Sequence, residues 1–187
     1  MILMQEPSFV FNSVDVPSPT YRMWQTEDGD RGTTVADLAA LMAEATRRAW
    51  EQKSSNLRNI VINCHGLDGG GLLMIGGDGK RGLGASDASQ FSFLRNSRHM
   101  TGTIWITACQ AANGSAGKLL CSKLATESGY QVVGSEEDQE VDAWDFYRGV
   151  TGMAHHIDEF EGKVYAFHAG GGWRVINPHE DIYTIRE

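Results

Sequence analysis

Apolar side chains recur at helical spacing in the segment that follows Thr34. The apolar positions are Val35, Leu38, Met42, Ala45 and Ala49. Their steps of three and four residues place them on one face of a helix. Thr34, with Asp37 three residues later, forms a capping-box signature that marks where a helix begins. The pattern predicts a helix over residues 35–52 that covers a sheet.

Three short apolar runs have the composition of buried strands. They are Asn59–Cys64, Thr103–Ala108 and Tyr130–Gly134. Each is rich in β-branched or aromatic residues, as expected for strands that are covered on both faces. Between the second and third runs, leucines at helical spacing fill the segment from Gly117 to Ser128, and Gly129 is placed to end a helix. This strand, helix, strand unit predicts a parallel pair with a right-handed crossover.

The remaining segments have weaker patterns. Residues 86–96 are typical of a helix, residues 72–75 of a hairpin between glycine-rich turns, and residues 163–168 and 173–176 of two strands in a hairpin or at an edge. Residues 1–32 hold three of the four prolines, and we interpret them as an N-terminal arm packed on the domain. Residues 33–187 are then one α/β domain with a mostly parallel sheet flanked by helices.

Charge and composition narrow the choice of partners and compartment. Of the 187 residues, 24 are acidic and 16 are Lys or Arg, a formal net charge of -8. This balance disfavours nucleic acid and anionic membrane surfaces as partners. No apolar run approaches the roughly 20 residues of a membrane helix, and no basic segment at the start suggests a signal peptide. Three cysteines cannot all pair, so we expect free thiols and a cytoplasmic location.

Two residues with catalytic chemistry follow the first and second predicted strands. His65 comes directly after the run that ends at Cys64, and Cys109 comes directly after the run that ends at Ala108. If the strands are adjacent and parallel, the imidazole and the thiol share one edge of the sheet. A nearby imidazole and a following helix N-terminus both lower the pKa of a thiol, and Gly66 can offer its backbone N–H to an oxyanion. On its own, a cysteine at a strand end is more often a small buried hydrophobe.

The segment Ile106–Ala112 (Ile-Thr-Ala-Cys-Gln-Ala-Ala), taken with the earlier His65-Gly66, resembles the caspase-like cysteine peptidases. The cysteine segment is particularly similar to the motif of the CHAT type. The resemblance covers residues 58–135 and implies a caspase-like fold. It implies that Cys109 is the nucleophile, that His65 is the general base and acid, and that the backbone amides of Gly66 and Cys109 form an oxyanion hole. The implied chemistry requires neither a cofactor nor a third catalytic residue.

An acidic segment follows the third predicted strand, at the same edge of the sheet. Residues 136–145 hold six of the 24 acidic side chains and no basic one. In the caspase-like clan, the residue before the scissile bond is usually held by a pocket of opposite charge. We therefore hypothesise that one or two of these carboxylates bind an Arg or Lys side chain of the substrate, with Glu136, Glu137 and Asp138 as the candidates. A solvated acidic loop or a calcium-binding loop is the alternative.

The other ligand-type residues predict no metal site. Cys64 lies inside an apolar strand and Cys121 inside a helix, and neither has the spacing of a zinc motif, so we interpret both as packing residues. One cluster of ligand-type residues near the C-terminus is interpreted as a solvated turn: His155, His156, Asp158 and Glu159.

The prediction is a cysteine endopeptidase with a His65 and Cys109 dyad, acting on a protein or peptide substrate and cleaving after a basic residue. The principal alternative is a catalytically silent caspase-like module that binds a protein partner through the same cleft. A second alternative is an unrelated α/β hydrolase or transferase that uses Cys109. Regulation by a protein partner or by calcium stays open at this point.

Overall fold

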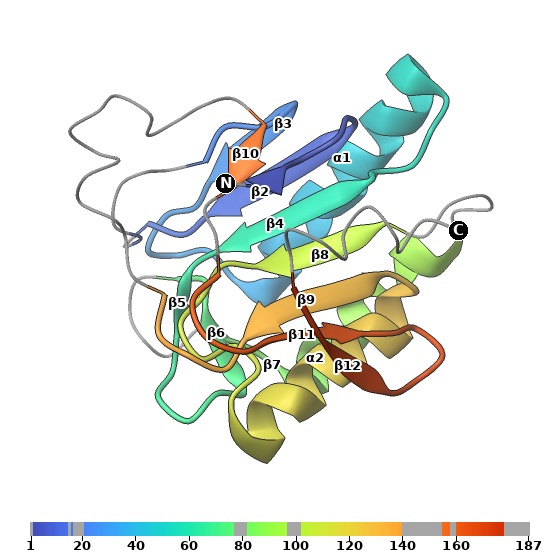
Figure 1. Cartoon of the computed structure of the whole chain (residues 1–187). Coiled ribbons are helices and arrows are strands. Elements are labelled where there is room, and N and C mark those ends of the chain that lie inside the picture. Colours follow the sequence, from blue (N-terminus) through green and yellow to red (C-terminus); the bar gives the residue numbers. More distant parts are fainter. Residues whose placement is uncertain are drawn as a thin grey trace.

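The computed structural model describes residues 2–14, 16, 21–76, 82–96, 102–139, 155–157 and 160–177. It has an α/β architecture, in which a mixed seven-stranded sheet is flanked by helices (Figure 1). The strands, in spatial order, are β3 (Gln25–Asp28), β2 (Ser8–Asn12), β4 (Asn59–Asn63), β8 (Thr103–Ile106), β9 (Gln131–Ser135), β11 (Val164–Phe167) and β12 (Trp173–Ile176). Neighbouring strands are parallel from β3 to β9, whereas β11 pairs antiparallel with both β9 and β12.

The strongest periodic patterns of the sequence form the expected elements. Helix α1 (Val35–Lys53) begins at the predicted capping box, in which Thr34 Oγ1 accepts from the Asp37 N–H and the Asp37 carboxylate accepts from the Thr34 N–H. Its buried positions include four of the five predicted ones. The second predicted helix is α2 (Gly114–Ser128), which ends at Gly129 with a φ of 76°. It connects β8 and β9, which are parallel, so the predicted parallel pair joined by a helix is confirmed.

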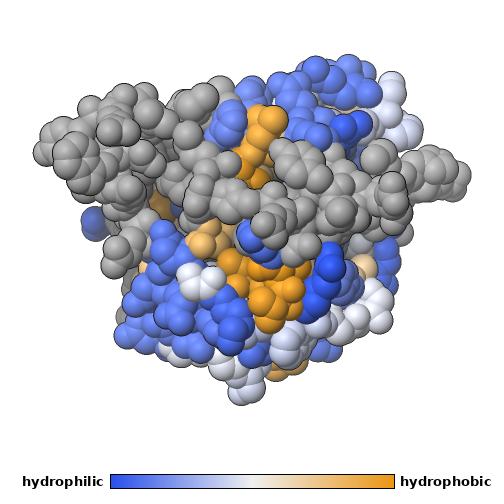
Figure 2. Space-filling view, in the orientation of Figure 1, coloured by the Kyte–Doolittle hydropathy of each residue, from blue (hydrophilic) through white to orange (hydrophobic). Residues whose placement is uncertain are grey.

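The two faces of the sheet are covered differently. Helices α1 and α2 and the 3-10 helix η1 (Ala85–Asn96) pack on one face, against side chains such as Phe9, Ile60 and Ile104 (Figure 1). The opposite face packs against the short antiparallel pair of β1 (Ile2–Leu3) and β10 (His156–Ile157) and against Phe160, whose ring stacks on Trp105. Figure 2 shows apolar surface between hydrophilic residues on this face. None of the helices in the described ranges is long and apolar enough to cross a membrane.

The N-terminal segment differs from the arm that its prolines suggested. Strand β2 lies inside the sheet between β3 and β4, and every one of its five residues is buried. Phe9 and Phe11 face the helices and Val10 faces the opposite side, which is the pattern of a strand covered on both faces. Burying each of these side chains contributes about 1.5–3 kcal/mol. Residues 8–12 and 25–28 are therefore part of the sheet and not an addition to its surface.

Several predicted element boundaries and types change in the structure. Strand β4 ends at Asn63 and β8 at Ile106, so each ends before the Cys64 and Ala108 that the sequence indicated. His65 belongs to a short strand of its own, β5 (His65–Gly66), which pairs with β6 (Leu72–Met74). β6 in turn pairs with β7 (Gly82–Gly84), so the predicted hairpin is part of a three-stranded sheet. Residues 85–96 form a 3-10 helix, and the C-terminal strands form the expected antiparallel hairpin with β12 at the edge.

Candidate active site

The strands β4 and β8 are adjacent and parallel, so the chain leaves both of them at the same edge of the sheet. His65 follows β4 within two residues and is half-buried. Cys109 follows β8 within three residues and is also half-buried, unlike the other two cysteines. The structure thus brings the loops that carry the imidazole and the thiol to one edge, the arrangement that adjacent parallel strands require.

The two loops touch at Gly66. A Cβ atom added to Gly66 would lie 1.8 Å from the carbonyl oxygen of Cys109 and 3.4 Å from its nitrogen. No side chain fits in that space, so glycine is required for this close approach of backbone to backbone. The contact continues along both loops, because a Cβ on Gly70 would lie 2.5 Å from the Asn113 carbonyl oxygen. We call the segment between β4 and β6, which includes β5, the histidine loop, and the segment between β8 and α2 the cysteine loop. The two loops are packed directly on one another.

The backbone N–H of Gly66 points away from strand β6. Leu67 N–H donates to the Leu72 carbonyl at 3.1 Å, and the register pairs Gly66 with Leu73. Hydrogen-bonded and non-hydrogen-bonded pairs alternate along an antiparallel ladder, so Gly66 and Leu73 form a non-hydrogen-bonded pair. The Gly66 amide is consequently directed to the side of β5 that is opposite β6. A donor so oriented, beside the Cys109 backbone, has the chemistry of an oxyanion-hole amide.

The thiol of Cys109 contacts the chain that follows β9. The backbone N–H of Gln139 donates to Sγ at 3.4 Å, and the thiol is 3.7 Å from the Gln139 carbonyl oxygen. The side chain of Gln139 is held in turn by the backbone of Glu161, whose N–H donates to Oε1 at 3.3 Å. Nothing in the sequence pattern pointed to Gln139, which is 30 residues from Cys109.

The other two cysteines are packing residues, as their positions in the sequence predicted. Cys64 and Cys121 are both buried. Burial raises the pKa of the Cys64 thiol, and it raises the pKa of Cys121 to about 12. The Cys121 thiol donates to the Ala111 carbonyl at 3.6 Å. Both remain protonated at neutral pH, and only Cys109 combines partial exposure with a position beside a histidine loop.

The three acidic side chains proposed for substrate binding have different surroundings. The Glu136 carboxylate accepts from the Tyr165 hydroxyl at 2.5 Å and lies 3.3 Å from Lys163 Nζ. The hydrogen bond from Tyr165 and the charge of Lys163 hold the pKa of Glu136 below its ordinary value, and the same hydrogen bond raises the pKa of Tyr165 to about 12. Glu136 is thus engaged within the protein.

Glu137 and Asp138 are exposed. The side chain of Glu137 lies against Gly162, where an added Cβ would be 1.9 Å from Glu137 Cγ. The Asp138 carboxylate instead accepts from the side chain of Gln110, the residue after Cys109, at 3.0 Å. Of the three carboxylates, Asp138 is therefore the one in contact with the cysteine loop. The acidic residues from 140 to 145 lie outside the described residues.

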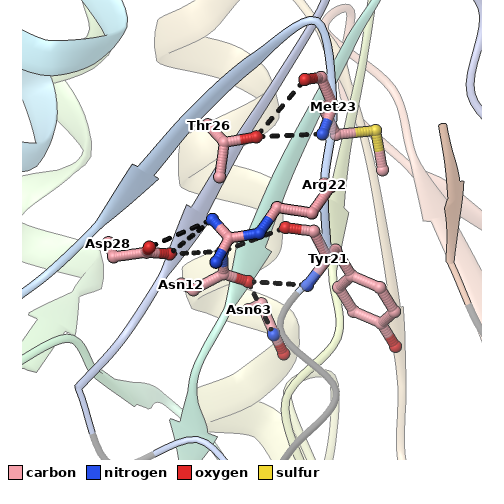
Figure 3. A network of polar contacts seen from close by, with 7 residues as sticks. All are labelled: Asn12, Tyr21, Arg22, Met23, Thr26, Asp28 and Asn63. Carbon is pink, nitrogen blue, oxygen red and sulfur yellow. Dashed lines mark hydrogen bonds and ion pairs between the residues drawn. The ribbon is translucent and has the colours of Figure 1, made fainter. Parts of the chain in front are cut away.

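A row of hydrogen-bonded polar side chains, of which Asn12 and Asn63 are buried, links the strand ends behind the two loops. Asn63 donates to Asn12 Oδ1 at 3.0 Å, and Thr107 donates to Asn63 Oδ1 at 3.1 Å. Asn12 also donates to Asp28 at 2.9 Å and exchanges hydrogen bonds with the backbone of Tyr21 (Figure 3). Asn63 and Thr107 each stand two residues before a candidate catalytic residue. The row therefore fixes the relative positions of the chain segments from which His65 and Cys109 emerge.

No group of three or more His, Cys, Asp or Glu side chains in the described part of the chain is arranged to hold a metal ion. His155 and His156, two members of the cluster interpreted as a solvated turn, are both partly buried. His155 Nε2 lies 3.6 Å from the Glu6 carboxylate. Asp158 and Glu159 lie outside the described residues.

Comparison of the sequence with models of known protein families gives no match, and comparison with curated proteins gives none either.

Proposed function

We propose that the chain is a cysteine endopeptidase with a caspase-like fold, in which Cys109 is the nucleophile and His65 the acid and base. The observation that carries the proposal is the contact between Gly66 and the Cys109 backbone. It joins the segments that follow the adjacent strands β4 and β8, which carry a histidine, a thiol and an amide that points away from β6. Each of these groups has a defined part in acyl transfer. The parallel pairing from β3 to β9 also agrees with a mostly parallel, caspase-like sheet.

The proposed reaction proceeds through an acyl-enzyme. His65 accepts the proton of the Cys109 thiol, and Sγ attacks the carbonyl carbon of the peptide bond. A bond forms between sulfur and carbon, and the carbonyl oxygen becomes an oxyanion that the amides of Gly66 and Cys109 stabilise. His65 then donates a proton to the leaving nitrogen as the bond between carbon and nitrogen breaks. Water, deprotonated by His65, attacks the thioester and releases the new carboxyl group and the thiol. Apart from the attacking water, the proposed mechanism uses side chains and backbone amides of this chain.

For substrate preference we propose a basic residue before the scissile bond, bound by Asp138. Asp138 is exposed and contacts the residue after the nucleophile, whereas Glu136 is already paired with Lys163 and Tyr165. Glu137 is exposed but lies toward Gly162. A carboxylate near the nucleophile attracts guanidinium and ammonium groups and repels acidic ones. Asp138 is therefore the first of the three acidic residues to test.

One observation favours a second function, a silent module that binds a protein partner through the same cleft. Both backbone polar groups of Gln139 contact the Cys109 thiol, at 3.4 and 3.7 Å. A substrate carbonyl must reach that sulfur, so the Gln139 segment has to move or the substrate has to approach from the other side. If neither occurs, the thiol remains covered and the fold serves recognition without catalysis.

The decisive experiment compares wild type, Cys109→Ala and His65→Ala in a whole-proteome extract, followed by mapping of new peptide termini. We expect new termini with wild type alone, preceded mainly by Arg or Lys. The same termini with all three proteins would remove the peptidase proposal. New termini preceded by Asp would retain the peptidase and reject Asp138 as the specificity residue.

Labelling with iodoacetamide at neutral pH distinguishes the peptidase from the silent module. We expect Cys109 to react faster than Cys64 and Cys121, which are buried, and to react more slowly in His65→Ala. Equal labelling of the three cysteines, or a Cys109 rate that does not change in His65→Ala, would favour the silent module.

A further inference from the structure

Gln110, the residue directly after Cys109, has an unusual backbone conformation. Its φ is +52°, one of three positive values among the described residues other than glycine. A side chain in this region is uncommon and costs of order 1–3 kcal/mol, and it persists only where the surroundings hold it. Two backbone hydrogen bonds hold Gln110, because its N–H donates to the Glu137 carbonyl and its own carbonyl accepts from the Asn113 N–H, both at 2.9 Å.

The side-chain amide of Gln110 is engaged at both ends. Oε1 accepts from the Gly69 N–H at 2.9 Å and from Asn113 Nδ2 at 2.8 Å, and Nε2 donates to Asp138 Oδ1 at 3.0 Å. Only an amide supplies an acceptor and a donor in this geometry. Glutamate at this position would face Asp138 with a second carboxylate, and alanine would leave all three partners without this contact.

These partners belong to three separate loops. Gly69 lies in the loop that carries His65, Asn113 lies directly before α2, and Asp138 lies in the acidic loop after β9. The Asn113 side chain makes no hydrogen bond with the start of α2 and instead binds Gln110. Gln110 is thus a single residue that joins the loops after β4, β8 and β9, and it is covalently attached to Cys109.

We propose that Gln110 is a positioning residue that holds the histidine loop, the cysteine loop and Asp138 in register, so that a cationic substrate group bound at Asp138 is aligned with the thiol. This inference rests on the proposed peptidase function. It extends that function by assigning the alignment of substrate and nucleophile to one amide. A displacement of about 1 Å in such an arrangement costs roughly 100-fold in rate.

The test uses Gln110→Glu, which keeps the shape of the side chain, and Gln110→Ala, which removes the amide without adding charge. The control is Gln52→Glu on the exposed face of α1, which changes the net charge equally and lies outside these loops. For each folded variant, kcat and KM are measured with paired fluorogenic peptides that differ only in Arg or Ala before the scissile bond. Thermal unfolding is recorded in parallel.

We expect both Gln110 variants to lose about 10- to 100-fold in kcat on the arginyl peptide, with a smaller change in KM and a reduced preference for Arg over Ala. Gln52→Glu should match wild type. A Gln110 variant that stays folded and keeps kcat and the Arg preference within about twofold of wild type overturns the inference, with the peptidase proposal intact.

A readout that does not require peptidase activity separates the two proposals. The rate of Cys109 alkylation is measured across pH 5–9 for wild type and Gln110→Ala. We expect the midpoint of the profile to shift in Gln110→Ala, because the contacts that place the thiol beside the histidine loop and Gln139 are loosened. An unchanged profile would contradict the positioning role of Gln110, even if the wild type cleaves no peptide. A shifted profile together with an inactive wild type would reject the peptidase proposal and leave the positioning role standing.

Discussion

The two ends of the parallel strands are constructed on different principles. At the amino end, the residues that precede β4 and β9 include the buried side chains of Leu57 and Tyr130. Tyr130 is 1% exposed, and its hydroxyl donates to the Leu57 carbonyl at 2.9 Å. A Cβ on Gly102 would lie 2.3 Å from the Tyr130 ring and 2.6 Å from the Leu57 carbonyl oxygen. The chain is therefore closely packed around Tyr130 at this end.

At the carboxyl end of the same strands, the loops are joined by partly exposed side chains. Gln110 connects three loops through its amide, and His65 and Cys109 are each half-buried. Both ends contain a glycine in close contact, Gly102 at one and Gly66 at the other. The packing at the buried end stabilises the fold, and the open end carries the residues that we propose to be reactive. The same substitution at the two ends should therefore have different consequences.

The largest effect is expected at the open end for Cys109→Ala. Loss of the nucleophile should lower turnover at least about 1,000-fold, with little change in the free energy of unfolding, because the side chain is only partly buried. Peptide hydrolysis and urea denaturation measure the two quantities. Cys121→Ala, at a fully buried thiol, is the control, and we expect it to lose stability and retain turnover. Retained hydrolysis in Cys109→Ala would end the proposed mechanism.

Gly66→Ala is expected to act on catalysis at the same end. The added methyl group would collide with the Cys109 carbonyl oxygen at 1.8 Å, so the two loops must separate and the amide donor must move. Loss of one oxyanion donor costs roughly 100- to 1,000-fold in kcat. Gly84→Ala is the control, since its nearest neighbour would be at an ordinary 3.6 Å. Turnover equal to that of Gly84→Ala would show that Gly66 has no part in the reaction.

Gly102→Ala makes the same change at the buried end. The new methyl group would overlap the Tyr130 ring and the Leu57 backbone, and overpacking of this kind destabilises by about 1–3 kcal/mol. We expect a lower midpoint of urea denaturation and normal kcat well below the unfolding transition. Gly170→Ala, where nothing lies within 4 Å, is the control. If Gly102→Ala instead reduced kcat in the folded protein, the division between the two ends would be wrong.

The smallest effect concerns Glu136, which is placed at the open end but serves stability. Its folded-state pKa lies below the ordinary 4.5, so its ionised form stabilises the protein above about pH 4.5, and this contribution is lost as pH falls through the lower folded-state value. Glu136→Gln should cost roughly 1 kcal/mol at pH 7. Urea denaturation from pH 7 to pH 3 should show the gap to wild type closing, and Glu127→Gln is the control. A gap that widens in acid would contradict the assignment.

The contrast between local and distant interactions also explains how far the sequence predicted the structure. Helix α1 and the β8, α2, β9 unit follow from periodicity and caps that lie within a few residues of each other. The sequence pattern assigned β2 to a surface arm because the strand is short and follows Pro7. Its five residues obtain their strand conformation from pairing with β4, some 50 residues away.

The candidate site shows the same division. The edge shared by His65 and Cys109 follows from the ends of two apolar runs, and the contact of Gly66 with Cys109 occurs there. Gln110 and Gln139 escaped prediction for a physical reason. The contacts of Gln110 depend on a positive φ, and those of both residues join loops that follow different strands. Neither property leaves a periodic pattern in the sequence.

We propose that Cys109, assisted by His65, attacks a peptide carbonyl at the open end. The most direct measurement is covalent trapping with a peptidyl acyloxymethyl ketone ending in Arg, followed by intact mass spectrometry and peptide mapping. We predict one adduct per chain at Cys109, slow formation in His65→Ala, and none in Cys109→Ala. No adduct, or adducts spread over all three cysteines at rates that His65→Ala leaves unchanged, would contradict the claim.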